Sequence, residues 1–199
     1  MPPDRISSHP ELARVARVLA ASVPTPAPRD APYFEAAVAL VLHPDEDGLE
    51  ALFIKRATHP DDPWSGQIAL PGGKRNADEA SLALTAMREM REETGVDLAT
   101  AAVMLGELDE LRPRSPLLPP IIVRPFVFAV ASRPALVLSD EVAEAFWAPL
   151  RDVFDPARRQ EISVSLPGVH MRRSAIGVGE HVIWGMTEHI LRTFEGLLR

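Results

Sequence analysis

The 199-residue chain contains no cysteine. That absence excludes disulfide bonds, thiolate metal sites and cysteine nucleophiles, although it leaves the redox compartment open. The chain also lacks an apolar stretch of the roughly 18 residues that a membrane span needs, and no secretory leader is recognisable at its start. Runs rich in lysine or arginine are missing, and the net charge is −7. Because surfaces that bind duplex nucleic acid are usually basic, we expect a cytoplasmic protein that binds neither membranes nor nucleic acid.

The composition is that of a globular protein, with 46% hydrophobic and 25% charged residues. The length suits one domain, with or without an appendage. Apolar residues recur at helical spacing over residues 8–21, and the next segment, 23–32, carries four prolines that favour an extended connector. We therefore expect an N-terminal helix and Pro-rich linker over residues 1–32, followed by the main domain over residues 33–199. The apolar face of that helix needs a surface, either on a second copy in a homodimer or on its own domain.

Apolar runs separated by turn residues predict strands in the main domain. The expected strands span residues 34–42, 50–55, 67–70, 103–111 and 121–130. A hairpin is expected over 161–173, a short element beginning at 146–150, and two long helices over 78–94 and 187–198. Strands interspersed with long helices indicate an α/β or α+β domain.

The helix expected over residues 78–94 is the most informative part of the chain. Asp78 is its expected N-cap, with Glu79 in the first turn, and Gly95 stands where a C-cap is expected. The sequence Pro-Gly-Gly at residues 71–73 precedes it, and glycines there permit close backbone approach to the helix. The apolar face of this helix consists of Leu82, Ala83, Ala86 and Met90.

Three glutamates on this helix, Glu89, Glu92 and Glu93, are three and four residues apart and therefore project to neighbouring positions on one side. Like charges at that spacing repel, unless a divalent cation lies between them. Oxygen ligands without a thiolate or histidine partner suit Mg²⁺ or Mn²⁺ better than zinc. Arg88 is placed to orient a carboxylate through a bidentate pair. The competing interpretation of the three glutamates is a solvated acidic helix face.

This stretch resembles the signature of the Nudix hydrolase family: Gly, five residues, Glu, seven residues, then Arg-Glu-apolar-x-Glu-Glu-x-Gly-apolar. The matching residues are Gly73, Glu79, Arg88, Glu89, Met90, Glu92, Glu93, Gly95 and Val96. Here eight residues, not seven, separate Glu79 from Arg88. The resemblance implies an α/β/α sandwich with a mixed β-sheet between helices, and a Nudix box at residues 73–96.

The longer spacing is similar to that of the coenzyme A pyrophosphatase branch of the family. The upstream pattern of that branch ends in Arg-x-x-x-Gly-x-x-x-Phe-Pro-Gly-Gly. This chain matches it at Gly66 and at residues 71–73, whereas Leu70 replaces the Phe and Asp62 replaces the Arg. Further segments that look like this branch are residues 125–128, 140–142 and 146–150.

The resemblance implies that water hydrolyses the diphosphate of a nucleoside diphosphate linked to another moiety, with Mg²⁺ (or Mn²⁺) as cofactor. Glu89 and Glu93 are then metal ligands, and Glu92 is a ligand or the general base. Some family members take the base from a later loop. Glu141 is the counterpart here, unless it is a plain surface acid.

The small-molecule partner implied by the resemblance is a nucleotide. Expected substrate contacts are Arg56, Gly72, Gly73, Lys74 and Trp64, together with Arg114. The cations bind phosphates unless they are ordinary surface residues, and Trp64 stacks on a base. Trp147 and Trp184 are expected in the core. Three hypotheses follow: a coenzyme A pyrophosphatase, a hydrolase of another nucleotide such as a nucleotide sugar, ADP-ribose or a nucleoside triphosphate, and a non-enzymatic nucleotide sensor.

Overall fold

The computed structural model describes residues 9–59, 64–113, 120–166 and 169–199. In these residues, seven strands form one mixed sheet whose main path runs β3-β2-β1-β6-β5. The strands on that path are β1 (Phe34–Asp45), β2 (Gly48–Arg56), β3 (Ile68–Ala69), β5 (Ala102–Glu107) and β6 (Ile121–Val130). Strands β1 and β6 are parallel, and the other pairs of the sheet are antiparallel.

Two strands lie off the main path. Strand β4 (Gly72–Lys74) pairs with the first part of β1, whereas β2 pairs with its last part. Strand β7 (Val142–Pro149) pairs with β2. Because β4 and β2 share one flank of β1, the sheet divides there.

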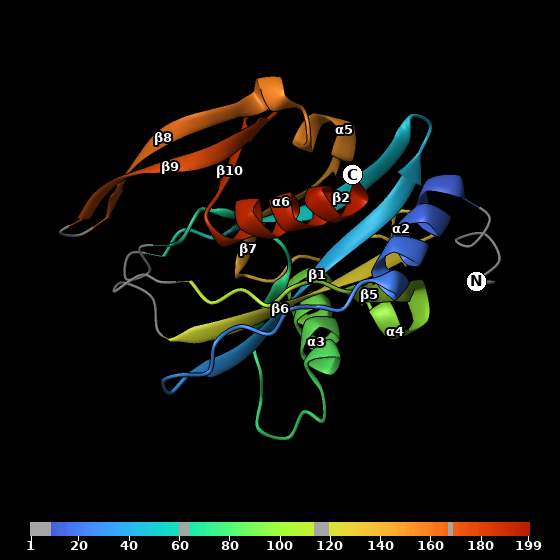
Figure 1. Cartoon of the computed structure of the whole chain (residues 1–199), viewed down its shortest axis with the longest axis horizontal. Coiled ribbons are helices and arrows are strands. Elements are labelled where there is room, and N and C mark those ends of the chain that lie inside the picture. The colour runs from blue at the N-terminus through green and yellow to red at the C-terminus, as the bar shows by residue number, and fades with distance from the viewer. Residues whose placement is uncertain (1–8, 60–63, 114–119, 167–168) are drawn as a thin grey trace.

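Helices cover both faces of the sheet (Figure 1). Helix α3 (Leu82–Thr94) lies on one face, and α2 (Pro10–Ala21) and α6 (Met186–Leu198) lie on the other. The period of two along β1 explains the division, because alternate side chains point to opposite faces. Leu40 and Leu42 pack with α2 and α6, whereas Ala39 and Val41 pack with α3. The expected helix–sheet–helix sandwich is therefore confirmed.

Helix α3 begins four residues later than the sequence suggested. Its N-cap is Ser81, whose hydroxyl accepts a hydrogen bond from Leu84 N, so the expectation that Asp78 caps the helix was wrong. Glu79 also precedes the helix, although it was expected in the first turn. Its carboxylate accepts hydrogen bonds from Asn76 N and from side chains on α3. The C-cap was predicted correctly: Gly95 adopts the left-handed conformation with φ of 74°.

The strand predictions differ from the structure mainly at their ends. Strand β6 has the expected bounds, whereas β3 is reduced to two residues and β5 ends at Glu107. Leu111, expected in that strand, forms only an isolated bridge with Val123. The segment 146–150 was expected to begin an element. It instead ends β7 and leads into α5 (Leu150–Val153), because its alternating apolar residues continue the pairing with β2.

The N-terminal helix α2 packs on the sheet of its own chain. Leu12, Val15 and Leu19 are buried in the same apolar cluster as residues of β1, β2 and α6. The linker that follows is held by the loop after β5, since Thr25 N donates to Asp109 Oδ1 and Ala27 N to Glu110 Oε2. The apolar face of α2 therefore has a partner without a second copy of the chain.

The C-terminal part adds a three-stranded antiparallel sheet of β8 (Arg159–Leu166), β9 (Val169–Val178) and β10 (His181–Trp184). The hairpin of β8 and β9 extends beyond the main sheet in Figure 1. The remaining short elements are α4 (Leu98–Ala101) and a 3-10 turn, Pro156–Arg158. In the described part of the chain, no helix has the length and apolar character to cross a membrane.

Candidate active site

The two glycines before α3 bring strand β4 into close contact with its neighbours. A Cβ on Gly72 would lie 2.3 Å from Ala37 O and 2.6 Å from Val38 Cα. Both atoms belong to the backbone of β1, which cannot move aside as a flexible side chain can. A Cβ on Gly73 would lie 2.4 Å from Glu89 Oε1. The missing side chain of Gly73 therefore leaves the space that the Glu89 carboxylate uses, and the missing side chain of Gly72 allows β4 to pair with β1.

Arg88 joins the helix, the preceding loop and β4 through its guanidinium group. Its Nε donates to Glu79 Oε1 at 2.7 Å and its Nη1 to Glu92 Oε2 at 2.6 Å. Its Nη2 donates to Glu89 Oε1 at 2.8 Å and to Lys74 O at 2.9 Å. Arg88 therefore holds Glu89 through one hydrogen bond, and it divides its donors among three glutamates where the sequence suggested a bidentate pair with one.

The extra residue between Glu79 and Arg88 lies in a loop and does not rotate Glu79 away from the helix. Because Glu79 precedes Ser81, the loop absorbs the longer spacing and the Glu79 carboxylate still reaches Arg88. Burial raises the pKa of Glu79, but hydrogen bonds from Arg88, Asn76 and Thr85 outweigh burial and hold that pKa below its usual value. Glu79 is thus an ionised support for Arg88.

Glu93 is a buried carboxylate, with only 7% of its surface exposed. Its Oε2 accepts a hydrogen bond from Gly72 N at 2.8 Å. Burial raises the pKa of Glu93 to about 8, opposed by the Gly72 hydrogen bond and reinforced by repulsion from Glu89 and Glu141. Arg56 lies close enough to lower this pKa, but the net shift is upward. The structure therefore disfavours the charged form of Glu93.

Glu89 shares this electrostatic environment. Burial raises its pKa, and repulsion from Glu92 and Glu141 adds to burial against the opposing hydrogen bond from Arg88. Glu141 lies in the turn before β7 and is exposed, and its backbone carbonyl accepts a hydrogen bond from Ala57 N. Glu89, Glu93 and Glu141 are thus electrostatic neighbours, although Glu141 lies about fifty residues away in the sequence. Glu92 differs from them, because its side chain is 54% exposed and pairs with Arg88.

These carboxylates have the chemistry of a site for a hard divalent cation. Oxygen donors are what Mg²⁺ and Mn²⁺ prefer, and a cation between Glu89 and Glu93 would relieve the repulsion that adds to burial in raising their pKa values. The space at Gly73 lets Glu89 lie against the β4 backbone beside the Gly72–Glu93 hydrogen bond. In the described residues, no three acidic or histidine side chains are already gathered as a ligand set. The fit to a metal therefore rests on Glu89 and Glu93.

A cavity of about 520 Å³ begins at this glycine strand. It brings together all five substrate contacts expected in the described residues, which are Arg56, Trp64, Gly72, Gly73 and Lys74. Two further positions singled out in the sequence, Asp62 and Arg114, lie outside the described residues. Lys74 also places its Nζ 3.7 Å from the centre of the Phe34 ring.

The opposite wall of the cavity comes from the C-terminal strands and α6, which sequence reasoning did not connect with the site. Met171, Arg173 and Trp184 line this wall. The expectation that Trp184 is a core residue was wrong: its ring borders the cavity, 6.1 Å from the ring of Trp64. Trp147, by contrast, packs against the core cluster beneath α3. Strands β10 and β3 are neighbours only in the folded chain. No residue spacing in the sequence therefore indicated that Trp184 borders the cavity.

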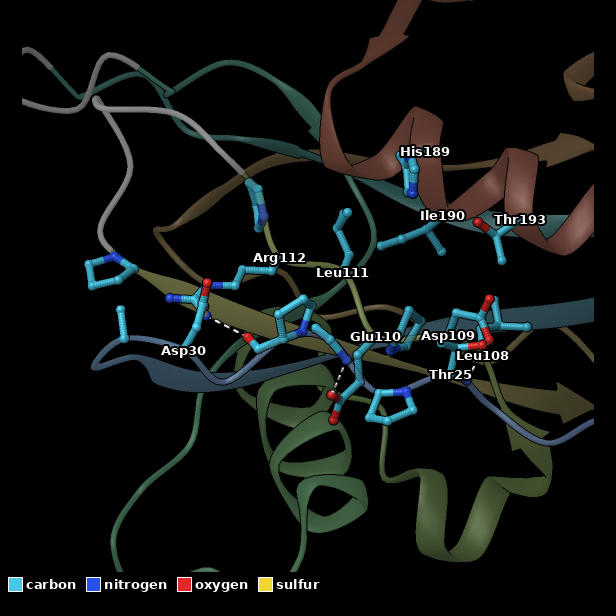
Figure 2. A pocket seen from close by; sticks show the side chains of 17 residues that line it. Thr25, Asp30, Leu108, Asp109, Glu110, Leu111, Arg112, His189, Ile190 and Thr193 are labelled. Atoms are coloured by element: carbon cyan, nitrogen blue, oxygen red, sulfur yellow. Dashed lines mark hydrogen bonds and ion pairs between the residues drawn. The ribbon is translucent and has the colours of Figure 1, made fainter.

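A second cavity, of about 570 Å³, lies between the N-terminal linker, the loop after β5 and α6 (Figure 2). Its polar groups bind one another. Figure 2 shows Arg112 with Asp30, and Glu110 beneath the linker backbone. Burial raises the pKa of Glu110, but hydrogen bonds from Ala27 N, Arg124 and Arg29 outweigh burial and lower it overall. The charged residues described in this cavity therefore hold the linker in place.

Residues 33–166 match the NUDIX domain. The chain belongs to the NUDIX family. The match includes the two glycines, the glutamates discussed above and strand β7, whereas β9, β10 and α6 lie beyond it. The Nudix box therefore supplies Glu79, Glu89, Glu92 and Glu93, and a region outside the match supplies the opposite wall of the cavity.

Curated relatives agree with this membership. An uncharacterized protein of Schizosaccharomyces pombe is 38% identical over 117 residues, which are 57% of this chain and 36% of that protein. The uncharacterized Nudix hydrolase NudL of Yersinia pestis is 33% identical over 129 residues, 64% of this chain and 62% of the relative. The matches thus span less than two thirds of either relative. An Ap4A hydrolase of C. elegans shares the fold, with a TM-score of 0.56 and 16% identity over 83% of this chain and 97% of that one.

Proposed function

We propose that this Nudix protein is a pyrophosphohydrolase that cleaves the diphosphate of a nucleoside diphosphate linked to another moiety, with Mg²⁺ or Mn²⁺ as cofactor. The observation that carries the proposal is Glu89 and the buried Glu93, which are held against the glycine strand β4, while Gly72, Gly73 and Lys74 of that strand line a cavity together with Arg56. Carboxylates and cations around one glycine strand suit a metal-bridged diphosphate.

In this proposal Glu89 and Glu93 hold the metal, and Glu92 is a further ligand. When bound, the ion neutralises charge on the diphosphate and makes water a stronger nucleophile. Arg88 does not contact the substrate. It positions Glu89 and Glu92 through the hydrogen bonds of its guanidinium group, while Glu79 holds Arg88 in turn.

The general base is assigned to Glu141, with Glu92 as the alternative. The exposed Glu141 carboxylate raises the pKa values of both Glu89 and Glu93, so it lies close to the proposed ligands without being buried among them. A carboxylate in that place can accept a proton from the attacking water. Glu92 is also exposed, but its carboxylate already binds Arg88. The variants Glu141→Gln and Glu92→Gln separate the two, because loss of the base removes the rise in rate with pH that accompanies deprotonation of the base.

The phosphate contacts are Arg56, Lys74 and the backbone of the glycine pair, and Trp64 contacts the base. All five residues line the cavity, and Gly72 and Gly73 also contact Glu93 and Glu89. Arg56 lies within electrostatic reach of Glu93, so a phosphate bound there would be close to the proposed metal ligands.

We infer that the substrate is coenzyme A or one of its derivatives. Support comes from the similarity of the residue spacing in the Nudix box and of residues 66–73 to the coenzyme A pyrophosphatase branch, and from the apolar part of the cavity, which suits a pantetheine arm. The alternative is another nucleotide, such as a nucleotide sugar, ADP-ribose or a nucleoside triphosphate. A nucleotide sensor is the non-enzymatic alternative, but a sensor does not need the intact set of glutamates that this chain retains.

A substrate panel tests these assignments. Coenzyme A, acetyl-coenzyme A, ADP-ribose, a nucleotide sugar and ATP would each be incubated with the protein and Mg²⁺ or Mn²⁺, and products separated by chromatography. We expect coenzyme A to yield an adenine diphosphate nucleotide and a phosphopantetheine, and chelation of the metal to abolish turnover. Cleavage of another compound alone would replace coenzyme A as the substrate. Tight binding of one compound without any cleavage would establish the sensor instead.

A further inference from the structure

The wall of the cavity that faces away from the glycine strand is one face of the C-terminal sheet. Trp184 on β10 lies opposite Ala175 on β9. Residues directly opposite in an antiparallel pair point to the same side, and alternate residues along a strand do likewise. Met171, Arg173 and Trp184 therefore share one face, and all three line the cavity. Ile176 and Ile183 on the other face are buried in the main core.

Trp184 presents an aromatic ring to the cavity. Its ring and that of Trp64 lie 6.1 Å apart and are tilted by 41°, so the two rings do not overlap face to face. The side chain is half-buried, and Met171 and Met186 line the cavity around it. A half-buried ring with flexible thioethers beside it suits a planar or apolar part of a ligand.

Arg173 is a cation without an acidic partner among the residues that the structure describes. Its one hydrogen bond is a weak one, from Nη1 to Arg172 O at 3.5 Å. Neighbouring arginines are paired: Arg172 with Glu161, and Arg192 with Glu188. The guanidinium of Arg173 is therefore exposed at the cavity with its donors largely unused, and a guanidinium is well suited to bind a phosphate through two parallel hydrogen bonds.

The same cavity extends from Gly73 and Lys74 on β4, the strand against which Glu89 and Glu93 lie, to Arg173 and Trp184 on β9 and β10. A substrate whose diphosphate lies at the first end can thus place another part of its structure against the second. No cation other than Arg173 lines the cavity from the C-terminal sheet in the described residues. One guanidinium beside an aromatic ring matches a phosphorylated nucleoside or a similar planar group that carries a phosphate.

We propose that Arg173 and Trp184 form a specificity site for substrates that carry a phosphomonoester in addition to the diphosphate that is cleaved. Arg173 pairs with the phosphomonoester, and Trp184 stacks on the group that bears it. The proposal rests on the hydrolase function proposed above and narrows its substrate class. Both residues lie outside the segment that matches the NUDIX domain, so specificity here is supplied by the C-terminal sheet.

The experiment compares two pairs of compounds whose members differ only by a phosphomonoester: coenzyme A with 3′-dephospho-coenzyme A, and NADPH with NADH. We expect the wild-type protein to hydrolyse the phosphorylated member with a kcat/KM about tenfold higher or more in at least one pair, because a charge-assisted hydrogen bond contributes this much. Arg173→Gln should remove the preference by raising KM for the phosphorylated member alone, with kcat unchanged.

Arg172→Gln is the matched control, because it removes the same charge one residue away, on the other face of β9, and should leave the preference intact. Trp184→Leu should raise KM for both members of a pair, and Trp184→Phe should restore most of the affinity. A preference that survives Arg173→Gln, or the absence of a preference in both pairs, would overturn the proposal.

Failure of the hydrolase function gives a different result. If the wild-type protein cleaves neither member of either pair, the proposed function fails, and binding of the same four compounds is measured by calorimetry. Tighter binding of the phosphorylated members, lost in Arg173→Gln, would still support the specificity site. Equal binding of both members of each pair would overturn it.

Discussion

Glu93 and Glu110 are both buried glutamates, yet the protein treats their charges in opposite ways. The Glu110 side chain is 2% exposed and binds Arg124, Arg29 and the backbone N–H of Ala27. These contacts outweigh burial and hold its pKa below the usual value. Glu93 is 7% exposed, and burial raises its pKa to about 8.

The difference is whether the chain itself supplies enough positive charge. Two arginines neutralise Glu110, and the result is a structural contact that holds the N-terminal linker. Glu93 has the Gly72 N–H and a more distant Arg56, and it is surrounded by the like charges of Glu89 and Glu141. A buried carboxylate left in this state suits a cation that comes from outside the chain. The contacts around each carboxylate therefore distinguish Glu110, a structural acid, from Glu93, which we propose binds a metal.

The largest expected effect is on turnover. Glu93→Gln should lower kcat by more than about 100-fold, above the 10–100-fold loss typical for residues that only support metal ligands, whereas Glu110→Gln should leave kcat unchanged. Steady-state kinetics at saturating Mg²⁺ measures both, with circular dichroism to check the fold. Near-normal turnover of Glu93→Gln would contradict the ligand assignment.

The two glutamates should also give the metal-free protein opposite pH dependences. The pKa of Glu93 is higher in the folded state, so its stabilising contribution is complete below about pH 4.5 and is lost as the pH rises to about 8. The expected loss is at most about 1.4 kcal/mol per pH unit. The pKa of Glu110 is lower in the folded state, so its contribution is present above its ordinary pKa and is lost as the pH falls through the folded value.

Urea unfolding in the presence of a chelator, at pH values from 3 to 9, measures these contributions. Glu93→Gln should flatten the fall in stability between about pH 5 and pH 8, while Glu110→Gln should flatten the fall in acid. Identical pH profiles for Glu93→Gln and the wild-type protein would show that Glu93 is ionised in the metal-free fold.

Removal of the structural acid should cost stability. Glu110→Gln leaves Arg29 and Arg124 without their shared carboxylate, and we expect a loss of about 1–3 kcal/mol in the free energy of unfolding at pH 7. Both arginines are about one third exposed, so water replaces part of the interaction and the loss stays below that of a fully buried pair. Urea unfolding measures the loss. A variant as stable as the wild-type protein would remove the distinction between the two acids.

The smallest expected effect is stabilisation by the metal. At pH 8.5 and a free Mg²⁺ concentration about ten times the Kd, the wild-type protein should gain about 1.4 kcal/mol. The gain should shrink at pH 6, where a proton on Glu93 competes with the ion, and should be lost in Glu93→Gln. Thermal unfolding with and without Mg²⁺ tests this, with Ca²⁺ as a comparison ion. An equal gain at both pH values would show that Glu93 does not exchange a proton for the metal.

Local patterns in the sequence were sufficient for much of the fold and for part of the site. The period of α3 brought Glu89 close to Glu92 and Glu93, and the apolar runs located β1, β2 and β6, because these features depend on residues a few positions apart. The start of α3 was misplaced because Asp78 and Ser81 are both good N-cap residues. The contacts that decide between them come from Glu79, whose carboxylate reaches Arg88 only in the folded loop.

The sequence by itself determined the box of glycines and glutamates, and with it membership of the NUDIX family, from which we propose a divalent cation. Only the tertiary structure decided which carboxylates are buried, that Glu141 lies beside Glu89 and Glu93, and that Trp184 and Arg173 border the cavity. Burial and the pairing of distant strands are properties of the packed molecule, since they depend on which segments the sheet and helices bring together. For that reason local residue spacing does not predict either property.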